Sequence, residues 1–197
     1  EVLFACPTMT VGTQATALGP SNAAILAYLA DPLRLTYPGG CNFVAAPDVA
    51  VGHRLIALAG RPGEHYLLGS ENATWEQIHR LIAELCGVPA PRAHINHSAA
   101  FLAATFEELR APLQGRKPLT TREQARMVGR YYWYSHAKAA ALGYRPAPLR
   151  AALAAACAWL VASPHVSREL RGQLRLHAEV HAARSAQRAG RTHDELR

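Results

Sequence analysis

The pair of residues with the clearest catalytic potential is a tyrosine and a lysine four positions apart, Tyr134 and Lys138. This spacing would put a phenol and an ammonium group on one face of a helix. The ammonium group would lower the phenol pKa, so that the tyrosine could exchange a proton with a substrate. Ser135, however, is a residue type that favours the start of a helix, which would leave Tyr134 before the helix and off the face of Lys138. We therefore predict no catalytic residue in this chain.

Ten histidines raise the question of a metal site. His177 and His181 have the spacing that puts two imidazoles on one helix face. Two ligands are too few, and no Glu follows the first histidine as a His-Glu-x-x-His motif requires. His94 and His97 flank a predicted strand, and we interpret them as surface residues, with a pocket position as the alternative. We predict no metal site.

The four cysteines are widely spaced and form no Cys-x-x-Cys motif. This pattern indicates neither a zinc site nor a disulfide framework. We expect reduced and buried thiols at Cys6, Cys41, Cys86 and Cys157.

Four consecutive aromatic residues, Tyr131 to Tyr134, could stack on a ring-bearing substrate. The interpretation that we favour is core packing against the last long helix of the domain. A dinucleotide fingerprint, in which glycines between a strand and a helix let a pyrophosphate approach the backbone, does not occur in the sequence.

Alternating strand and helix patterns predict an α/β fold. The strands are expected at 2–6, 33–37, 42–44, 64–68 and 93–95. Capping and breaking residues predict helices at 23–29, 47–60, 74–86, 98–112, 135–143 and 149–160, and a further helix start at the Thr120–Glu123 capping box. Beyond Ser163-Pro164 the sequence predicts an amphipathic helix that frays after Gly190.

The chain opens with the apolar stretch Val2 to Ala5, which is typical of a strand. A strand needs paired neighbours, so we expect that most of its sheet partners belong to sequence upstream of Glu1. This predicts a strand with at least one exposed edge.

Four segments, in this order, resemble the C-terminal half of extended short-chain dehydrogenase/reductases of the sugar-epimerase-like and dihydroflavonol-reductase-like kind. The resemblance covers roughly Val2 to Ala162, and the fold it implies is the C-terminal part of a Rossmann-type dehydrogenase. That part would have one or two sheet strands and a mostly helical substrate-binding subdomain. The segments are Cys6–Gly12 (CPTMTVG), Asp48–His53, Gly63–Gly69 and Leu142–Pro146.

The resemblance also implies site residues and a cofactor. The segment after the first strand would lie beside the nicotinamide end of NAD or NADP, with Pro7, Thr8 and Met9 seating the cofactor. The substrate would be contacted by the residues that follow and by two asparagines, namely Thr10, Val11, Gly12, Asn22 and Asn42. In this family the catalytic tyrosine and lysine precede the strand, whereas Tyr134 lies more than a hundred residues after it, which again argues against Tyr134. Asp48 is interpreted as a helix-end residue.

A net charge of +7 would suit nucleic acid, but the arginine-rich stretch 165–197 carries an excess of only three positive charges. We therefore do not expect a nucleic-acid partner. No apolar run approaches the roughly 18 residues of a membrane span, so we expect a cytoplasmic protein with no membrane partner. The expected organisation is a substrate-binding half over 1–163 and a basic helical tail over 164–197.

The leading functional hypothesis is the substrate-binding portion of an NAD(P)-dependent reductase or epimerase. It would act on a sugar-like or other hydroxy or keto small molecule and be inactive on its own. Its expected partners are that small molecule and a missing N-terminal dinucleotide-binding half, and a homo-oligomer is left open. The alternative is a non-catalytic binding or interaction module derived from that fold. Any pocket should be bordered by the 7–12 loop and the 38–42 turn, away from the tail histidines.

Overall fold

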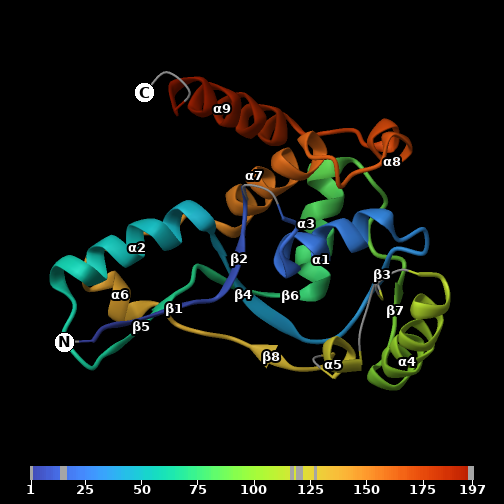
Figure 1. The fold of residues 1–197 in the computed structure, drawn as a ribbon, viewed down its shortest axis with the longest axis horizontal. Helices are drawn as coiled ribbons and strands as arrows, with labels where there is room; N and C mark the ends of the chain where they lie inside the picture. Colours follow the sequence, from blue (N-terminus) through green and yellow to red (C-terminus); the bar gives the residue numbers. More distant parts are fainter. Residues whose placement is uncertain (1, 14–16, 116–117, 119–121, 127, 195–197) are drawn as a thin grey trace.

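The computed structural model describes residues 2–13, 17–115, 118, 122–126 and 128–194, and it has a mixed α/β fold (Figure 1). The described strands are β1 (Phe4–Pro7), β2 (Met9–Val11), β3 (Leu35–Thr36), β4 (Gly40–Ala45), β5 (His65–Leu68), β6 (Glu71–Thr74), β7 (Ala93–His94) and β8 (Tyr131–Tyr132). The described helices are α1 (Pro20–Ala30), α2 (Ala46–Ala59), α3 (Trp75–Cys86), α4 (His97–Leu113), α5 (Arg122–Ala125), α6 (Ala137–Ala140), α7 (Leu149–Ala162), α8 (Arg168–Gln173) and α9 (Ala178–Asp194). The predicted α/β class is confirmed, whereas β2, β6 and β8 were not predicted, and β2 lies in the segment 7–12 that was predicted to be a loop.

The strands pair mostly in parallel. β1 lies parallel to β5 with Phe4 opposite His65, and β2 lies parallel to β4 with Met9 opposite Phe43. β4 also pairs with β6 in antiparallel and with β8 in parallel, while β3 and β7 form a separate parallel pair. Among the described strands β5 is the sole partner of β1, so the other edge of β1 is open, as predicted.

Helices cover the strands on both sides (Figure 1). α2 packs against β1, β2, β4 and β5, while α1 and α7 pack against β2. α7 also contacts β4, α3 and α9. Its side chains Leu153, Cys157 and Leu160 are fully buried because α7 has packed neighbours nearly all round, as expected of a helix that is apolar on every face.

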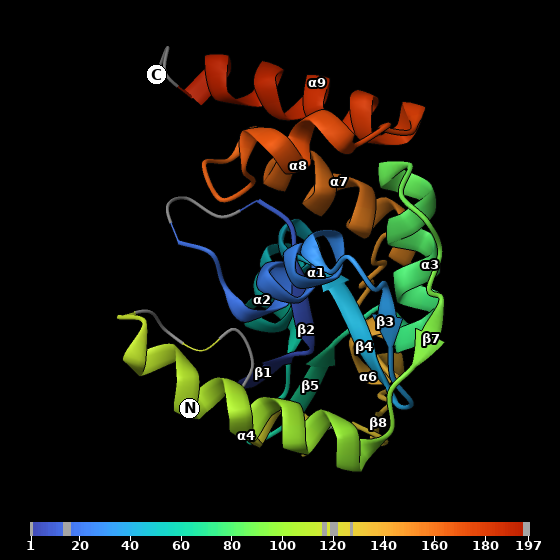
Figure 2. The ribbon, with the colours of Figure 1, turned by 90° about the vertical axis from the view of Figure 1, so that its right-hand side faces the viewer.

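The arginine-rich tail is helical and packs onto the body of the molecule. Figure 2 shows α8 and α9 stacked over α7. Val166, Leu174 and Val180 are buried in the same hydrophobic cluster as Leu153. The division at residue 163 stays a prediction, and the two parts share one core. α9 extends past Gly190 to Asp194, and residues 195–197 lie outside the described residues.

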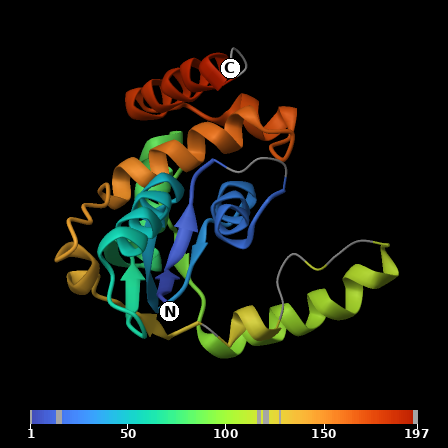
Figure 3. The same ribbon diagram turned by 60° about the vertical axis from the view of Figure 1, so that its left-hand side comes forward.

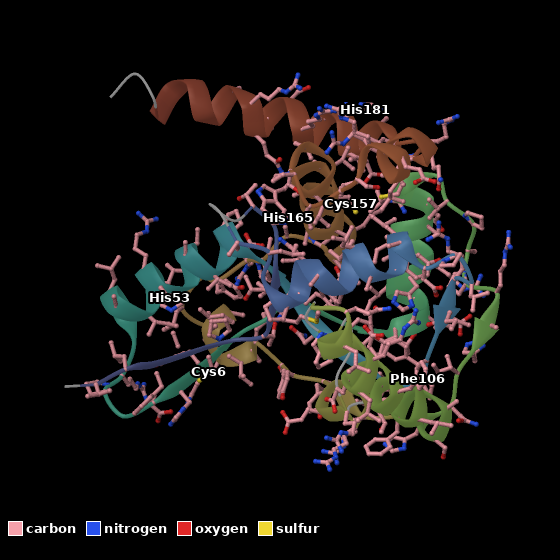
Figure 4. All side chains as sticks on the ribbon, turned by 45° about the vertical axis from the view of Figure 1, so that its right-hand side comes forward. Cys6, His53, Phe106, Cys157, His165 and His181 are labelled. Atoms are coloured by element: carbon pink, nitrogen blue, oxygen red, sulfur yellow. The ribbon has the colours of Figure 1, made fainter. Side chains whose placement is uncertain are left out.

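α4 stands away from the body of the molecule (Figure 3). Four large apolar side chains on it are exposed, at spacings that give one side of a helix. We call this surface the α4 apolar face, and it consists of Leu102, Phe106, Leu109 and Leu113, with Phe106 labelled in Figure 4. The predicted cap Ser98 is wrong by two residues, since the Asn96 side chain accepts from the Ala99 N–H at 2.9 Å.

Local capping signals explain several helix ends. Thr74 and Gln77 form the predicted capping box at the start of α3, and Gly87 ends that helix at a φ of 64°, which glycine adopts at low cost. α6 begins at Ala137 with His136 rather than Ser135 as its N-cap residue, although Ser135 Oγ accepts from the Ala137 N–H at 3.3 Å. The capping box predicted from Thr120 and Thr121 falls outside the described residues.

The cysteines are free thiols, as predicted. Cys41, Cys86 and Cys157 are buried and Cys6 is half-buried. Burial raises the pKa of the Cys41 thiol to about 12, so it is inert as a nucleophile at neutral pH. None of the described helices is long and apolar enough to cross a membrane.

Candidate functional site

The candidate site lies between β1 and β2, which follow each other in the chain but pair with different strands. β1 pairs with β5 as far as Pro7, and β2 pairs with β4 from Met9 onward, with Thr8 between them. The Thr8 N–H donates to the Leu68 carbonyl at 3.1 Å, and the Ser70 N–H donates to the Phe43 carbonyl at 2.9 Å. These bonds bring the carboxyl ends of β1 and β5 against the middle of β4. We call this region the Thr8 junction, consisting of Pro7–Met9, Asn42 and Gly69–Ser70.

Asn42 links the strands of the Thr8 junction. Its Oδ1 accepts from the Thr8 hydroxyl at 2.9 Å and from the Ser70 N–H at 3.0 Å. Its Nδ2 donates to Asn72 Oδ1 at 2.7 Å and to the Tyr134 carbonyl at 3.4 Å. The residue is buried, so a direct substrate contact stays a prediction, while the contacts give it a role in fixing backbone positions.

Gly69 provides the space that Asn42 needs. A Cβ atom at this position would overlap Asn42 Oδ1 and lie 3.0 Å from Thr8 Cγ2. No side chain larger than hydrogen fits without moving the amide. Sequence reasoning did not single out Gly69, Ser70 or Asn72, and the signal for Gly69 was its place at the end of the Gly63–Gly69 segment.

The side chains predicted to contact ligands do not all lie on the same face of β2. Val11 is buried in the main hydrophobic cluster and Met9 packs against that cluster. Thr10 lies between them in the strand and faces the other way, because successive side chains of a strand alternate. Its hydroxyl donates to the Thr8 carbonyl at 3.2 Å and is half-buried. Pro7 is exposed and Thr8 is half-buried.

Gly12 and Asn22 form a second fixed point, at the start of the loop after β2. Asn22 Nδ2 donates to the Gly12 carbonyl at 2.7 Å, and the Gly12 N–H donates to Asn22 Oδ1 at 3.3 Å. Gly12 has a φ of 128°, which strongly favours glycine. Asn22 is completely buried, so its amide holds the loop, and its predicted substrate contact remains untested.

Two comparisons relate this chain to known proteins over about half of their length. A protein of Synechocystis sp., provisionally named a dihydroflavonol 4-reductase, is 29% identical over 168 residues, which are 81% of this chain and 48% of that protein. The crystal structure of gox2253 superposes with a TM-score of 0.66 at 30% identity and covers 84% of this chain and 50% of its own. The predicted resemblance to a dihydroflavonol reductase is confirmed over about half of that protein's length. No model of a known protein family matches it.

A more distant solved structure shares the fold. The dTDP-glucose 4,6-dehydratase DesIV of Streptomyces venezuelae, solved with NAD and DAU bound, gives a TM-score of 0.53 at 16% identity. The match covers 85% of this chain and 46% of the dehydratase. The chain therefore spans about half the length of the relatives that it matches.

Tyr134 and Lys138 have the spacing of a catalytic pair but do not form such a pair here. Tyr134 precedes α6, whose first residue is Ala137, as predicted. Lys138 Nζ donates to a carboxylate oxygen of Glu64 and lies 5.3 Å from the centre of the Tyr66 ring. The Lys138 hydrogen bond and charge lower the pKa of Glu64. These contacts indicate a surface ion pair.

The prediction that the aromatic stretch Tyr131 to Tyr134 packs into the core is wrong. Tyr131, Trp133 and Tyr134 are exposed, and Tyr131 and Trp133 meet edge to face at 5.2 Å. Only the half-buried Tyr132 packs against the main hydrophobic cluster. The reason is that β8 pairs with β4 at Gly40 and Cys41, at the edge of the sheet and away from the last helix.

Within the described residues, no group of histidine, cysteine or acidic side chains could hold a metal ion. His94 and His97 are exposed, as predicted, and His94 Nε2 lies 3.2 Å from Glu76 Oε2. His177 lies just before α9, where its carbonyl accepts from the His181 N–H at 3.3 Å. Asp48 accepts from the Ala147 N–H at 2.8 Å in the first turn of α2, which fits its predicted structural role.

One cavity lies beside a histidine of the tail, where we predicted no pocket. A cavity of about 460 Å³ lies against the tail and is lined by Val161, Arg171, Leu174, Arg175, Leu176, His181 and Arg184. The tail packs onto α7 through Val166, Leu174 and Val180, and the cavity lies beside this contact.

Proposed function

We propose that this chain provides the substrate-binding side of an NAD(P)-dependent reductase or epimerase. The substrate would be a sugar-like or other hydroxy or keto small molecule. One observation carries the proposal: the carboxyl ends of the parallel strands β1 and β5 meet at Asn42, with Pro7 and Thr8 accessible there. Ligands of open α/β sheets bind beyond the carboxyl ends of parallel strands. The related reductase and NAD-bound dehydratase support the same assignment.

In this proposal the accessible residues of the Thr8 junction contact the ligands and the buried ones hold them in place. Pro7, Thr8 and Met9 seat the nicotinamide end of the cofactor, and Thr10 faces the substrate. The loop that begins at Gly12 forms a further wall. Val11, Asn22 and Asn42 act as positioning residues, because each is buried in the chain.

NAD or NADP supplies the hydride chemistry when it is bound, and this chain orients the substrate. The described residues contain no glycine-rich turn between a strand and a helix that could cradle a pyrophosphate. We therefore place dinucleotide phosphate binding and acid/base catalysis in a complementary half. The open edge of β1 is where the parallel sheet of that half would continue.

The test is a titration of the 197-residue chain and of the complete gene product with NADH and NADPH, followed by nicotinamide fluorescence. The chain alone should bind neither dinucleotide tightly, and the complete product should bind one of them. In the complete product Thr8→Val should weaken binding about 5-fold, the worth of one hydrogen bond of about 1 kcal/mol. Thr105→Val is the matched control, since the Thr105 hydroxyl donates to the Phe101 carbonyl within its own helix, α4.

Two outcomes would overturn the proposal. Micromolar binding by the chain alone would mean that phosphate recognition resides in it. Absence of dinucleotide binding by a folded complete product would instead favour the non-catalytic binding module.

A further inference from the structure

The cavity against the tail has a composition that its packing role does not explain. Its lining contains three arginines and one histidine but no carboxylate. The remaining lining residues are apolar, namely Val161, Leu174 and Leu176. Figure 4 labels His181, which comes from α9, at this end of the molecule. The elements that form the cavity are different from those of the Thr8 junction.

Two of the arginines are held in place by backbone carbonyls. Arg171 Nη2 donates to the carbonyls of Ser163 at 2.8 Å and Val166 at 3.0 Å. Arg175 Nη1 donates to the carbonyls of Gly172 at 3.1 Å and Leu174 at 3.3 Å. A guanidinium group has five N–H donors, so each keeps donors for another acceptor. These bonds orient the groups without neutralising them.

Arg184 is the third arginine, and its Nε is buried without a hydrogen-bond partner in the described part of the chain. A buried donor that lacks a partner carries the full cost of desolvation. Two carboxylates of the adjoining helices α3 and α9, Glu84 and Glu179, pair with Arg150 at 2.8 Å and 2.9 Å. Within the described residues no ion pair joins Arg171, Arg175 or Arg184 to a carboxylate.

We propose that this cavity binds a phosphate monoester with an apolar substituent. Guanidinium groups match the geometry of phosphate oxygens, and three of them with an imidazole suit a dianion better than a single carboxylate. Val161, Leu174 and Leu176 would contact the apolar part. The cavity has a volume of about 460 Å³ and is open to solvent, so a ligand could enter it directly. The proposal does not depend on the function proposed for the Thr8 junction.

The test measures binding of phenyl phosphate, inorganic phosphate and phenol to the full chain by isothermal titration calorimetry at fixed ionic strength. Phenyl phosphate should bind saturably with one site, inorganic phosphate more weakly, and phenol not measurably. Arg184→Met should weaken phenyl phosphate binding at least 10-fold, since a hydrogen bond to a charged group is worth about that factor. Arg54→Met, at an exposed arginine of α2, is the matched control and should change nothing.

A stability measurement separates binding from a structural role. Without ligand, Arg184→Met should raise Tm, because it removes a buried donor that lacks a partner. A residue needed only for folding would lower Tm instead. Should Arg184→Met fail to fold, Arg184→Lys keeps the charge, lacks the Nε donor and should lose part of the affinity. Unsaturable binding, an equal loss in Arg54→Met, or unchanged affinity in both Arg184 variants would overturn the proposal.

Discussion

The stability of the fold should depend on pH through one buried histidine, His79 of α3. The side chain is only 4% exposed, and its Nδ1 lies 2.9 Å from the Thr36 hydroxyl. Its ring stacks on that of Tyr28 with centres 4.3 Å apart and planes 5° apart. Burial lowers the pKa of His79 to about 4, outweighing the attraction of Asp31 for the charged form. The imidazole is therefore neutral in the folded protein at pH 5.

The unfolded chain binds this proton more readily, since an exposed histidine has a pKa of about 6.5. Stability is fully present above pH 6.5 and falls as the pH drops toward the folded pKa of about 4. One pKa unit corresponds to about 1.4 kcal/mol, so the full loss is about 3 kcal/mol. Between pH 7 and pH 5 the expected loss is about 2 kcal/mol.

Urea unfolding followed by tryptophan fluorescence at pH 7, 6 and 5 measures this effect. The range stops at pH 5 because hydrogen bonds from Lys138 and Arg80 lower the pKa of Glu64 and Glu76, whose contributions are lost only at more acidic pH. His79→Gln should abolish most of the slope, and the exposed His53→Gln should keep it. A free energy of unfolding that is constant from pH 7 to pH 5, or a slope that survives in His79→Gln, would refute the assignment.

Three further predictions concern the candidate site. Asn42→Leu should lower the free energy of unfolding by about 2–4 kcal/mol in urea titrations, because it removes the buried hydrogen bonds to the Thr8 hydroxyl, the Ser70 N–H and Asn72 Oδ1. A loss below about 1 kcal/mol would contradict the linking role. Gly69→Ala should lower the free energy of unfolding by more than about 2 kcal/mol in the same assay, because its Cβ would overlap the Asn42 amide. In Gly172→Ala the new Cβ meets nothing within 4 Å, so this variant should raise the free energy of unfolding by up to about 1 kcal/mol. Tyr134→Phe and Lys138→Ala should leave the turnover of the complete gene product within about twofold, while a collapse of about 10²- to 10⁴-fold in a folded variant would make Tyr134 the acid/base residue.

Elements with local signals were predictable from the sequence. Thr74, Gln77 and Gly87 define both ends of α3 through bonds to residues a few positions away, and the structure has each of them. Pro47 and Asp48 likewise mark the first turn of α2. Such signals work because the groups that satisfy a helix end are close in the chain.

The features that escaped prediction depend on distant partners. β2, β6 and β8 were missed, and all three pair with β4, so their formation depends on a strand that is distant in the sequence. The substrate contact predicted for Asn42 came from the resemblance alone and stays a prediction. Its hydrogen-bond partners are residues 8, 70, 72 and 134, which are distant in the sequence and could not be foreseen from it. The cavity depends on how arginine side chains pack between helices, which no local pattern encodes.

The α4 apolar face bears on how long this polypeptide survives in a cell. Its four side chains are between 63% and 87% exposed, and in the described part of the chain they cover no core. Chaperones and proteases continuously sort chains by exposed apolar surface. A folded copy of this polypeptide therefore exposes apolar surface, as a partly unfolded chain does. We expect mutations that make the α4 apolar face polar to raise the steady-state level without changing the fold.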